Sequence, residues 1–228
     1  WQGNTLVSET FANFNKVFGE HELSATVGHS YQYDEYRTSN LSAYDFVNET
    51  LNNENLGAGN PELNDLSNGL TETKLVSGIF RATYAYAWKY LFTFTSRADG
   101  SSKFGDNNKW AYFPSGAVSW KAHEEGFMAG QNVFGQLKFR ASYGISGNQG
   151  ISPYQTLSRY GISNYYNDGA WITSIGPGIE VGRTGQSGIE VLWGGIPNPD
   201  LRWETTAQVD YGVDFSVFNN RLNVTFDY

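Results

Sequence analysis

Apolar and polar residues alternate along much of the chain. From Trp203 to Val217, positions 203, 205, 207 and so on carry mostly apolar side chains, while the positions between them are mostly polar. Successive side chains of a strand point to opposite faces, so a period of two predicts a β-strand with one apolar and one polar face. Strands are predicted in eight runs: 5–15, 22–36, 76–88, 91–99, 110–122, 136–146, 203–217 and 221–228. The pattern therefore predicts an all-β chain.

The longest of these runs exceed the usual length of strands in soluble domains. Runs 22–36 and 203–217 each contain 15 residues, whereas strands in globular proteins usually have about 5–6. A tilted strand that crosses a membrane needs about 9–11 residues. The runs are thus long enough to cross an outer membrane and project beyond it.

The connections between the predicted strands alternate in length. They are, in order, 16–21, 37–73, 89–90, 100–109, 123–135, 147–202 and 218–220. Outer-membrane barrels have short periplasmic turns and long extracellular loops in strict alternation. Segment 123–135 is longer than a periplasmic turn requires, and we expect a helical turn there at the barrel rim. Segment 147–202 is long enough to be a binding or gating loop.

Aromatic residues make up 16% of the chain and charged residues 17%. Membrane barrels carry rings of aromatic side chains at both water–lipid interfaces. Five aromatic residues near strand ends are predicted to form these girdles: Trp88, Tyr90, Trp110, Tyr112 and Trp203. Lys138 and Arg140, on the opposite face of their strand, are expected to look into a hydrated lumen.

Charge and cysteine content exclude several classes of function. The net charge of −8 disfavours a nucleic-acid partner, since phosphate binding needs clustered Lys and Arg. Without cysteine there is no thiolate nucleophile and no zinc–cysteine site. His21, His29 and His123 are widely separated and form no known catalytic or metal motif. We therefore expect no catalytic residues, no metal and no cofactor, and we interpret the acidic segment 37–73 as a solvated loop rather than a calcium site.

Three segments resemble a known family in their order and chemistry. The first runs from Arg97 to Ser115 and contains Arg-Ala-Asp-Gly-Ser-Ser-Lys-Phe-Gly followed by Tyr-Phe-Pro-Ser. The second, Leu137 to Gln149, ends in Gly-Asn-Gln, and the third, Asn198 to Thr206, begins Asn-Pro-Asp-Leu-Arg-Trp-Glu-Thr. Together they resemble the C-terminal barrel half of SusC/RagA-type TonB-linked outer-membrane transporters.

The resemblance implies an antiparallel transmembrane β-barrel segment of about eight long strands with long extracellular loops. Residues 1–228 would be a partial barrel domain, without the plug domain and the remaining strands. Because Trp1 follows no initiator Met or signal peptide, we expect an internal fragment.

Members of this family take up nutrients, as glycans, oligosaccharides or peptides, across the outer membrane of Gram-negative, Bacteroidetes-like bacteria. The partners implied are outer-membrane lipid, a SusD-like surface lipoprotein, and TonB, which would act through the missing N-terminal part.

Four aromatic residues in the long segment 147–202 are candidates for ligand contact: Tyr165, Tyr166, Trp171 and Trp193. Aromatic faces stack on ligand rings, and neighbouring Asn and Asp can hydrogen-bond hydroxyl groups. The alternative is that these rings pack the loop onto itself or against a partner.

A secreted β-sandwich that acts as a carbohydrate-binding module is the alternative for the whole chain. It predicts short strands in two packed sheets, with the aromatic residues as a ligand platform.

Overall fold

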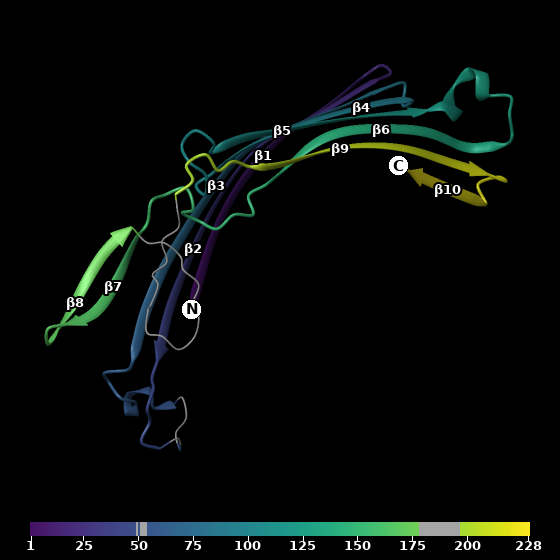
Figure 1. Cartoon of the computed structure of the whole chain (residues 1–228). Coiled ribbons are helices and arrows are strands. Elements are labelled where there is room, and N and C mark those ends of the chain that lie inside the picture. The colour runs from purple at the N-terminus through teal and green to yellow at the C-terminus, as the bar shows by residue number, and fades with distance from the viewer. Residues whose placement is uncertain (49, 51–53, 178–196) are drawn as a thin grey trace.

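The computed structural model describes residues 1–48, 50, 54–177 and 197–228. Eight of the described strands form one antiparallel sheet in the order β1-β2-β3-β4-β5-β6-β9-β10, and β7 pairs with β8 in a separate hairpin (Figure 1). The strands are β1 Gln2–Phe18, β2 His21–Ser42, β3 Asp65–Tyr86, β4 Tyr90–Ser101, β5 Trp110–Lys121, β6 Phe134–Asn148, β7 Tyr160–Asn167, β8 Ala170–Pro177, β9 Glu204–Val217 and β10 Leu222–Asp227. The predicted all-β antiparallel fold is confirmed. Strands β1 and β10 lie at the two edges, so the sheet is open.

Strands β2 and β3 are longer than the sequence pattern predicts. Their ladder continues from His21↔Tyr86 to Ser42↔Asp65, so the connection expected over 37–73 spans only 43–64. The prediction was wrong here because the polar composition of the segment suggested a loop. A strand pair needs only its backbone ladder, which continues regardless of side-chain polarity.

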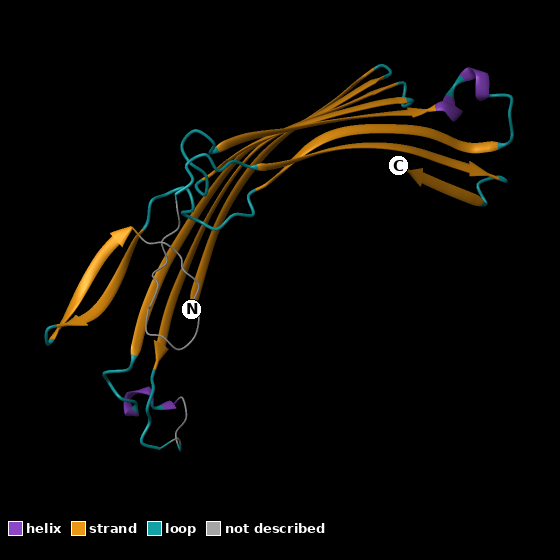
Figure 2. Ribbon diagram, viewed as in Figure 1, coloured by secondary structure: helices purple, strands orange, loops and turns teal. Residues whose placement is uncertain are grey.

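Connections alternate between the two ends of the sheet. The connections 19–20, 87–89, 122–133 and 218–221 lie at one end, called here the turn end, and all but 122–133 are short. The connections 43–64, 102–109 and 149–203 lie at the other, the loop end (Figure 2). The helical turn expected in 123–135 is confirmed by two short 3-10 helices, Ala122–Glu124 and Gly126–Met128.

Two tight turns at the turn end use left-handed backbone. Phe218, Asn219 and Asn220 have φ values of 56°, 55° and 61°, a conformation that asparagine tolerates well. Trp88, expected at the end of a strand, instead lies in a turn with φ 58°. Strand β3 ends earlier because Ala87 also has positive φ, at 50°.

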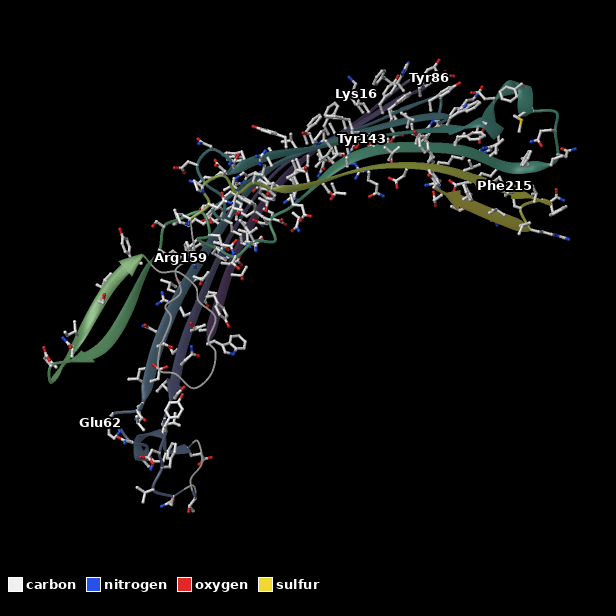
Figure 3. The ribbon with its side chains drawn as sticks, in the orientation of Figure 1. Lys16, Glu62, Tyr86, Tyr143, Arg159 and Phe215 are labelled. Carbon is white, nitrogen blue, oxygen red and sulfur yellow. The ribbon has the colours of Figure 1, made fainter. Side chains whose placement is uncertain are left out.

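The sheet has one apolar and one polar face. On β6 and β9, Tyr143 lies opposite Val209 and Phe139 opposite Val213, whereas the alternate pairs are polar. Many apolar-face side chains are exposed, among them Phe94 at 49% and Tyr211 at 57%. Figure 3 shows the side chains standing off the sheet, with Tyr143 near its middle. A sheet with an uncovered apolar face resembles the wall of a membrane barrel rather than one layer of a sandwich.

The β-sandwich alternative is therefore not supported. It requires short strands in two packed sheets, but the main sheet contains strands of up to 22 residues. The other described sheet, β7–β8, has only two strands. The small hydrophobic core of the described residues lies at the loop end, where connections fold over the sheet.

Candidate functional site

Three aromatic side chains form a buried cluster at the loop end. Phe104 comes from connection 102–109, Phe113 from β5, and Trp203 from the residue before β9. Their exposed fractions are 2%, 8% and 8%. The Trp203 ring centroid lies 5.0 Å from that of Phe104 and 5.4 Å from that of Phe113, the latter edge-on. This aromatic cluster fixes the connection 102–109 and the entry to β9 against the sheet.

The burial of Trp203 corrects its predicted place in a membrane girdle. The side chain packs inside the aromatic cluster, and its Nε1 donates a hydrogen bond of 3.1 Å to the backbone carbonyl of Lys109. A buried indole needs such an acceptor for its N–H. The sequence pattern placed Trp203 correctly at the end of a strand, but it could not show that a loop covers it.

An ion pair lies on β4 close to the aromatic cluster. The Nε of Arg97 lies 2.7 and 2.8 Å from the two carboxylate oxygens of Asp99. A second guanidinium nitrogen donates to the Oγ of Ser77 on β3 at 3.0 Å. Ser77 and Asp99 are buried. Residues two apart on a strand share a face, which explains the Arg-Ala-Asp spacing of the first motif.

Connections 102–109 and 149–203 contact each other directly. The Nζ of Lys103 donates to the carbonyl of Gln149 at 3.4 Å. Gly105 lies so close to Pro199 that an added Cβ would stand 2.5 Å from the Pro199 carbonyl oxygen. The three motif segments of the sequence are therefore one structural unit, which their order along the chain alone did not reveal.

The long connection is tied at its base. The hydroxyl of Tyr154 accepts a hydrogen bond from the Glu72 backbone N–H at 2.7 Å and lies 3.2 Å from the Glu72 carbonyl. Next to it, the Asn198 backbone N–H donates to the Gln155 carbonyl at 3.1 Å. The segment 156–197, called here the excursion, thus leaves and returns at one fixed point of the sheet.

The excursion contains the β7–β8 hairpin, in a segment that the sequence pattern led us to expect as loop. Asp168 and Gly169 form its turn, with φ values of 49° and 81°. Two central residues with positive φ define a type I′ turn, and Asp-Gly is among its preferred sequences. Asn167-Asp168-Gly169-Ala170 was therefore a readable hairpin signal that we missed.

Three of the four candidate ligand-contact residues lie in this hairpin. Tyr166 pairs with Trp171 next to the turn, and Tyr165 pairs with Ile172. Trp193 lies outside the described residues. The hairpin register places Tyr165, Tyr166 and Trp171 next to the same turn, and their contact with a ligand stays a prediction.

Charged residues cluster on the polar face near the turn end. The guanidinium of Arg140 makes two hydrogen bonds of 2.9 Å to Asp214 on β9 and one of 2.9 Å to Asp227 on β10. Lys138 lies 3.9 Å from Asp214. Lys138, Arg140 and Asp227 border a depression of about 310 Å³ that also includes Asp210. Lys138 and Arg140 thus lie on the polar face, as expected.

The remaining predicted girdle residues are distributed over both ends. Tyr90 and Trp88 lie at the turn end. Trp110 and Tyr112 lie toward the loop end, opposite Gly100 and Ala98, with exposed fractions of 55% and 71%. Their positions suit two interfacial rings, and their contact with lipid stays a prediction.

The Glu125 carboxylate at the turn end accepts hydrogen bonds from two aromatic side chains. Glu125 accepts hydrogen bonds from the Tyr90 hydroxyl at 2.6 Å and from the Trp120 indole at 3.2 Å, and it lies 3.4 Å from the Lys89 ammonium. The hydrogen bonds from Tyr90 and Trp120, with the nearby Lys89 charge, lower the pKa of Glu125. The helical turn is thereby fastened to β4 and β5.

The three histidines do not come together. The Nδ1 of His21 lies 2.6 Å from the Tyr84 hydroxyl, and that of His123 lies 3.1 Å from the Leu137 carbonyl. Within the described part of the chain, no three acidic or histidine residues are placed to hold a metal ion. No helix among the described residues is long and apolar enough to span a membrane.

Comparisons with known proteins agree with this architecture. The family model for the TonB dependent receptor-like β-barrel matches residues 1–228. TonB-dependent receptor P3 of Formosa agariphila is 41% identical over 225 residues, which cover 99% of this chain and 21% of that protein. TonB-dependent receptor SusC of Bacteroides thetaiotaomicron is 35% identical over 163 residues, which cover 69% of this chain and 14% of SusC.

Solved structures show the same relationship. The structure of the RagAB peptide transporter matches with a TM-score of 0.77 and 26% identity, covering 99% of this chain and 23% of that one. The chain therefore spans about a fifth of the length of its curated relatives. The motifs, the open sheet with one apolar face, and these matches agree: the chain belongs to the TonB-dependent receptor β-barrel family, as a SusC/RagA-like fragment of the barrel.

Proposed function

We propose that this chain is a section of the barrel wall in an outer-membrane TonB-dependent transporter that imports nutrients as glycans, oligosaccharides or peptides. The observation that carries the proposal is the two-faced sheet. Apolar side chains such as Phe94 and Val118 are exposed on one face, whereas Arg140 and Asp214 pair on the other. Lipid would cover the first face, and water or the interior of the pore would contact the second. This role consists of recognition and passage, with no bond made or broken.

Residues 1–228 would form a partial barrel domain whose plug and remaining strands belong to the rest of the protein. Similarity to SusC and to the RagAB peptide transporter supports a SusD-like surface lipoprotein as a partner at the loop end. TonB would act through the N-terminal part outside this chain. The open edges at β1 and β10 support the same view, because unpaired strand edges are costly in lipid.

Cysteine scanning of the full-length protein in native outer membranes tests the orientation of the wall. The chain has no cysteine of its own. Phe94→Cys and Val118→Cys place thiols on the apolar face, and the neighbours Thr93→Cys and Ala117→Cys place them on the polar face. A charged, water-soluble maleimide should label the second pair and spare the first. Equal labelling of both pairs would refute the assignment of the faces.

Substrate contact is proposed for Tyr165, Tyr166, Trp171 and Trp193. The register of β7–β8 supports grouping Tyr166 with Trp171, which pair across the hairpin. In the full transporter, Trp171→Ala should weaken binding of the imported glycan or peptide, because stacking on the indole is lost. Trp1→Ala, at a side chain 89% exposed elsewhere on the chain, is the control. An unchanged affinity for Trp171→Ala removes this residue from the proposed site.

A further inference from the structure

The outer part of strand β3 has one edge without a partner strand. The ladder between β3 and β2 continues outward to Asp65, whereas the ladder between β3 and β4 begins only at Leu75. Residues 65–74 are therefore paired on the β2 side alone among the described strands. An unpaired strand edge presents a row of backbone donors and acceptors that another strand can bind.

Existing contacts show which backbone groups face this edge. The N–H of Lys74 donates to the Ser102 Oγ at 2.8 Å, and the Lys74 carbonyl accepts from the Ser102 N–H at 2.9 Å. Two residues outward, Glu72 bonds to the Tyr154 hydroxyl. The backbone N–H and C=O groups of successive strand residues point to opposite edges of the strand. The groups of the next even-numbered residues therefore face the same edge as those of Glu72: Leu70, Asn68 and Leu66. No described strand pairs with them there.

The β7–β8 hairpin also has a strand edge without a partner. Strand β7 pairs only with β8, so its other edge has no partner strand among the described residues. An isolated two-stranded hairpin is marginally stable in water. Arg159 lies at the root of the hairpin (Figure 3). Its Nε is buried and has no hydrogen-bond partner among the described residues.

The hydrogen bonds between Tyr154 and Glu72 hold the start of β7 close to the free edge of β3, and the two strands run in opposite directions. Tyr154 is held at Glu72, and β7 begins at Tyr160, a short distance along the chain. Strand β7 runs outward, away from the main sheet, whereas β3 runs inward, from the loop end to the turn end (Figure 1). Pairing of the two would be antiparallel, like every other pair in the sheet. Strand β7 has 8 residues, comparable to the free edge at 65–74.

We infer that the β7–β8 hairpin is a flap that closes by adding β7 to the free outer edge of β3. Closure extends β2 and β3 into a four-stranded sheet and satisfies the edge groups of Leu66, Asn68 and Leu70. It also moves the turn that carries Tyr166 and Trp171 alongside β3. The inference goes beyond the proposed function, because closure depends on backbone pairing and holds whichever substrate the transporter carries.

Disulfide cross-linking in the full-length protein in outer membranes tests the closure. Asn68→Cys is combined in turn with Ile162→Cys, Ser163→Cys and Asn164→Cys, which sample neighbouring registers, and copper phenanthroline is the oxidant. The control combines the same three β7 cysteines with Asn40→Cys. Asn40 pairs with Ser67, the neighbour of Asn68, and lies on β2, one strand further from β7. A disulfide cannot bridge Cα atoms more than about 7 Å apart.

Cross-linking of Asn68→Cys to one or two of the β7 cysteines, without cross-linking of Asn40→Cys, is the expected result. Absence of any Asn68 cross-link, or equal cross-linking of both positions, overturns the inference. Asn68 and Asn40 are exposed, so the cysteines do not disturb the sheet.

The contact between Tyr154 and Glu72 is tested by adding Tyr154→Phe to the cross-linking pair. This change keeps the ring and removes the hydroxyl that holds the Glu72 backbone. The initial rate of cross-linking should fall roughly fivefold, the factor that corresponds to one typical hydrogen bond. An unchanged rate shows that Tyr154 does not position the flap. Because the readout is a disulfide and not uptake, a transporter that fails to import the tested nutrient leaves the result interpretable.

Discussion

The indole N–H of Trp203 donates to the backbone carbonyl of Lys109 at 3.1 Å, across 94 positions of sequence. This contact joins the entry of β9 to the entry of β5. With Phe104 and Phe113 packed on the same indole, it makes the loop end a small folded core above an otherwise single-layered sheet.

Replacing Trp203 should destabilise this core strongly. Trp203→Ala removes a buried indole, and such changes cost about 3–5 kcal/mol. Trp203→Phe keeps most of the packing and loses the hydrogen bond to Lys109, so it should cost less. Unfolding of the full-length barrel in detergent measures both, with Trp1→Ala as the exposed control. If Trp203→Ala unfolds like the control, the cluster does not stabilise the protein.

Gly105 should tolerate no side chain. An alanine Cβ would lie 2.5 Å from the backbone carbonyl oxygen of Pro199, which cannot rotate away. We expect Gly105→Ala to cost about 1–3 kcal/mol, as overpacking does, and to loosen segment 198–203. Gly78→Ala is a matched control on β3, since a Cβ added there would meet no atom within 4 Å. Equal stability of the two variants would contradict the close approach.

The turn of the β7–β8 hairpin should depend on Gly169. Its φ of 81° is strained for any residue with a side chain, so Gly169→Ala should speed amide hydrogen exchange across β7 and β8. The control is Gly176→Ala, in the same hairpin, at a glycine without positive φ and with open space around it. Unchanged exchange in Gly169→Ala would show that the turn has another conformation in the whole protein.

The turn end should weaken in acid through Glu125. The Tyr90 and Trp120 hydrogen bonds lower the pKa of this carboxyl from its ordinary value of 4.5. Its stabilising contribution is therefore present above pH 4.5 and is lost as the pH falls through the lowered pKa.

Glu125→Gln should accordingly remove part of the acid sensitivity of unfolding below pH 4.5. Tyr90→Phe, which deletes the strongest donor, should shift the loss to higher pH. Unfolding curves of the full-length protein between about pH 3 and 7 measure these changes. Superimposable pH profiles for the wild type and Glu125→Gln would exclude a role for this carboxylate.

The sheet could be predicted from sequence because its period of two is local. Val209, Tyr211 and Val213 alternate with polar residues whatever lies beside them, and the structure confirms their strand. Where the strand ends depends on hydrogen bonds to a neighbour, so the outward extensions of β2 and β3 were missed.

The loop end was harder to predict because its contacts join distant segments. Nothing near Trp203 in sequence indicates Phe104 or the Lys109 carbonyl, and the girdle interpretation was the reasonable local one. The hairpin at Asp168-Gly169 is a different case, since its turn signal was local and was overlooked.

Strands β6 and β9 remain in register up to Asn148↔Glu204, although the whole excursion is inserted between them. The inserted chain enters and leaves through neighbouring residues, where Asn198 bonds to Gln155. Its length and sequence can therefore change without altering the register between β6 and β9. Such an insertion can differ between relatives while the strands on both sides keep their pairing.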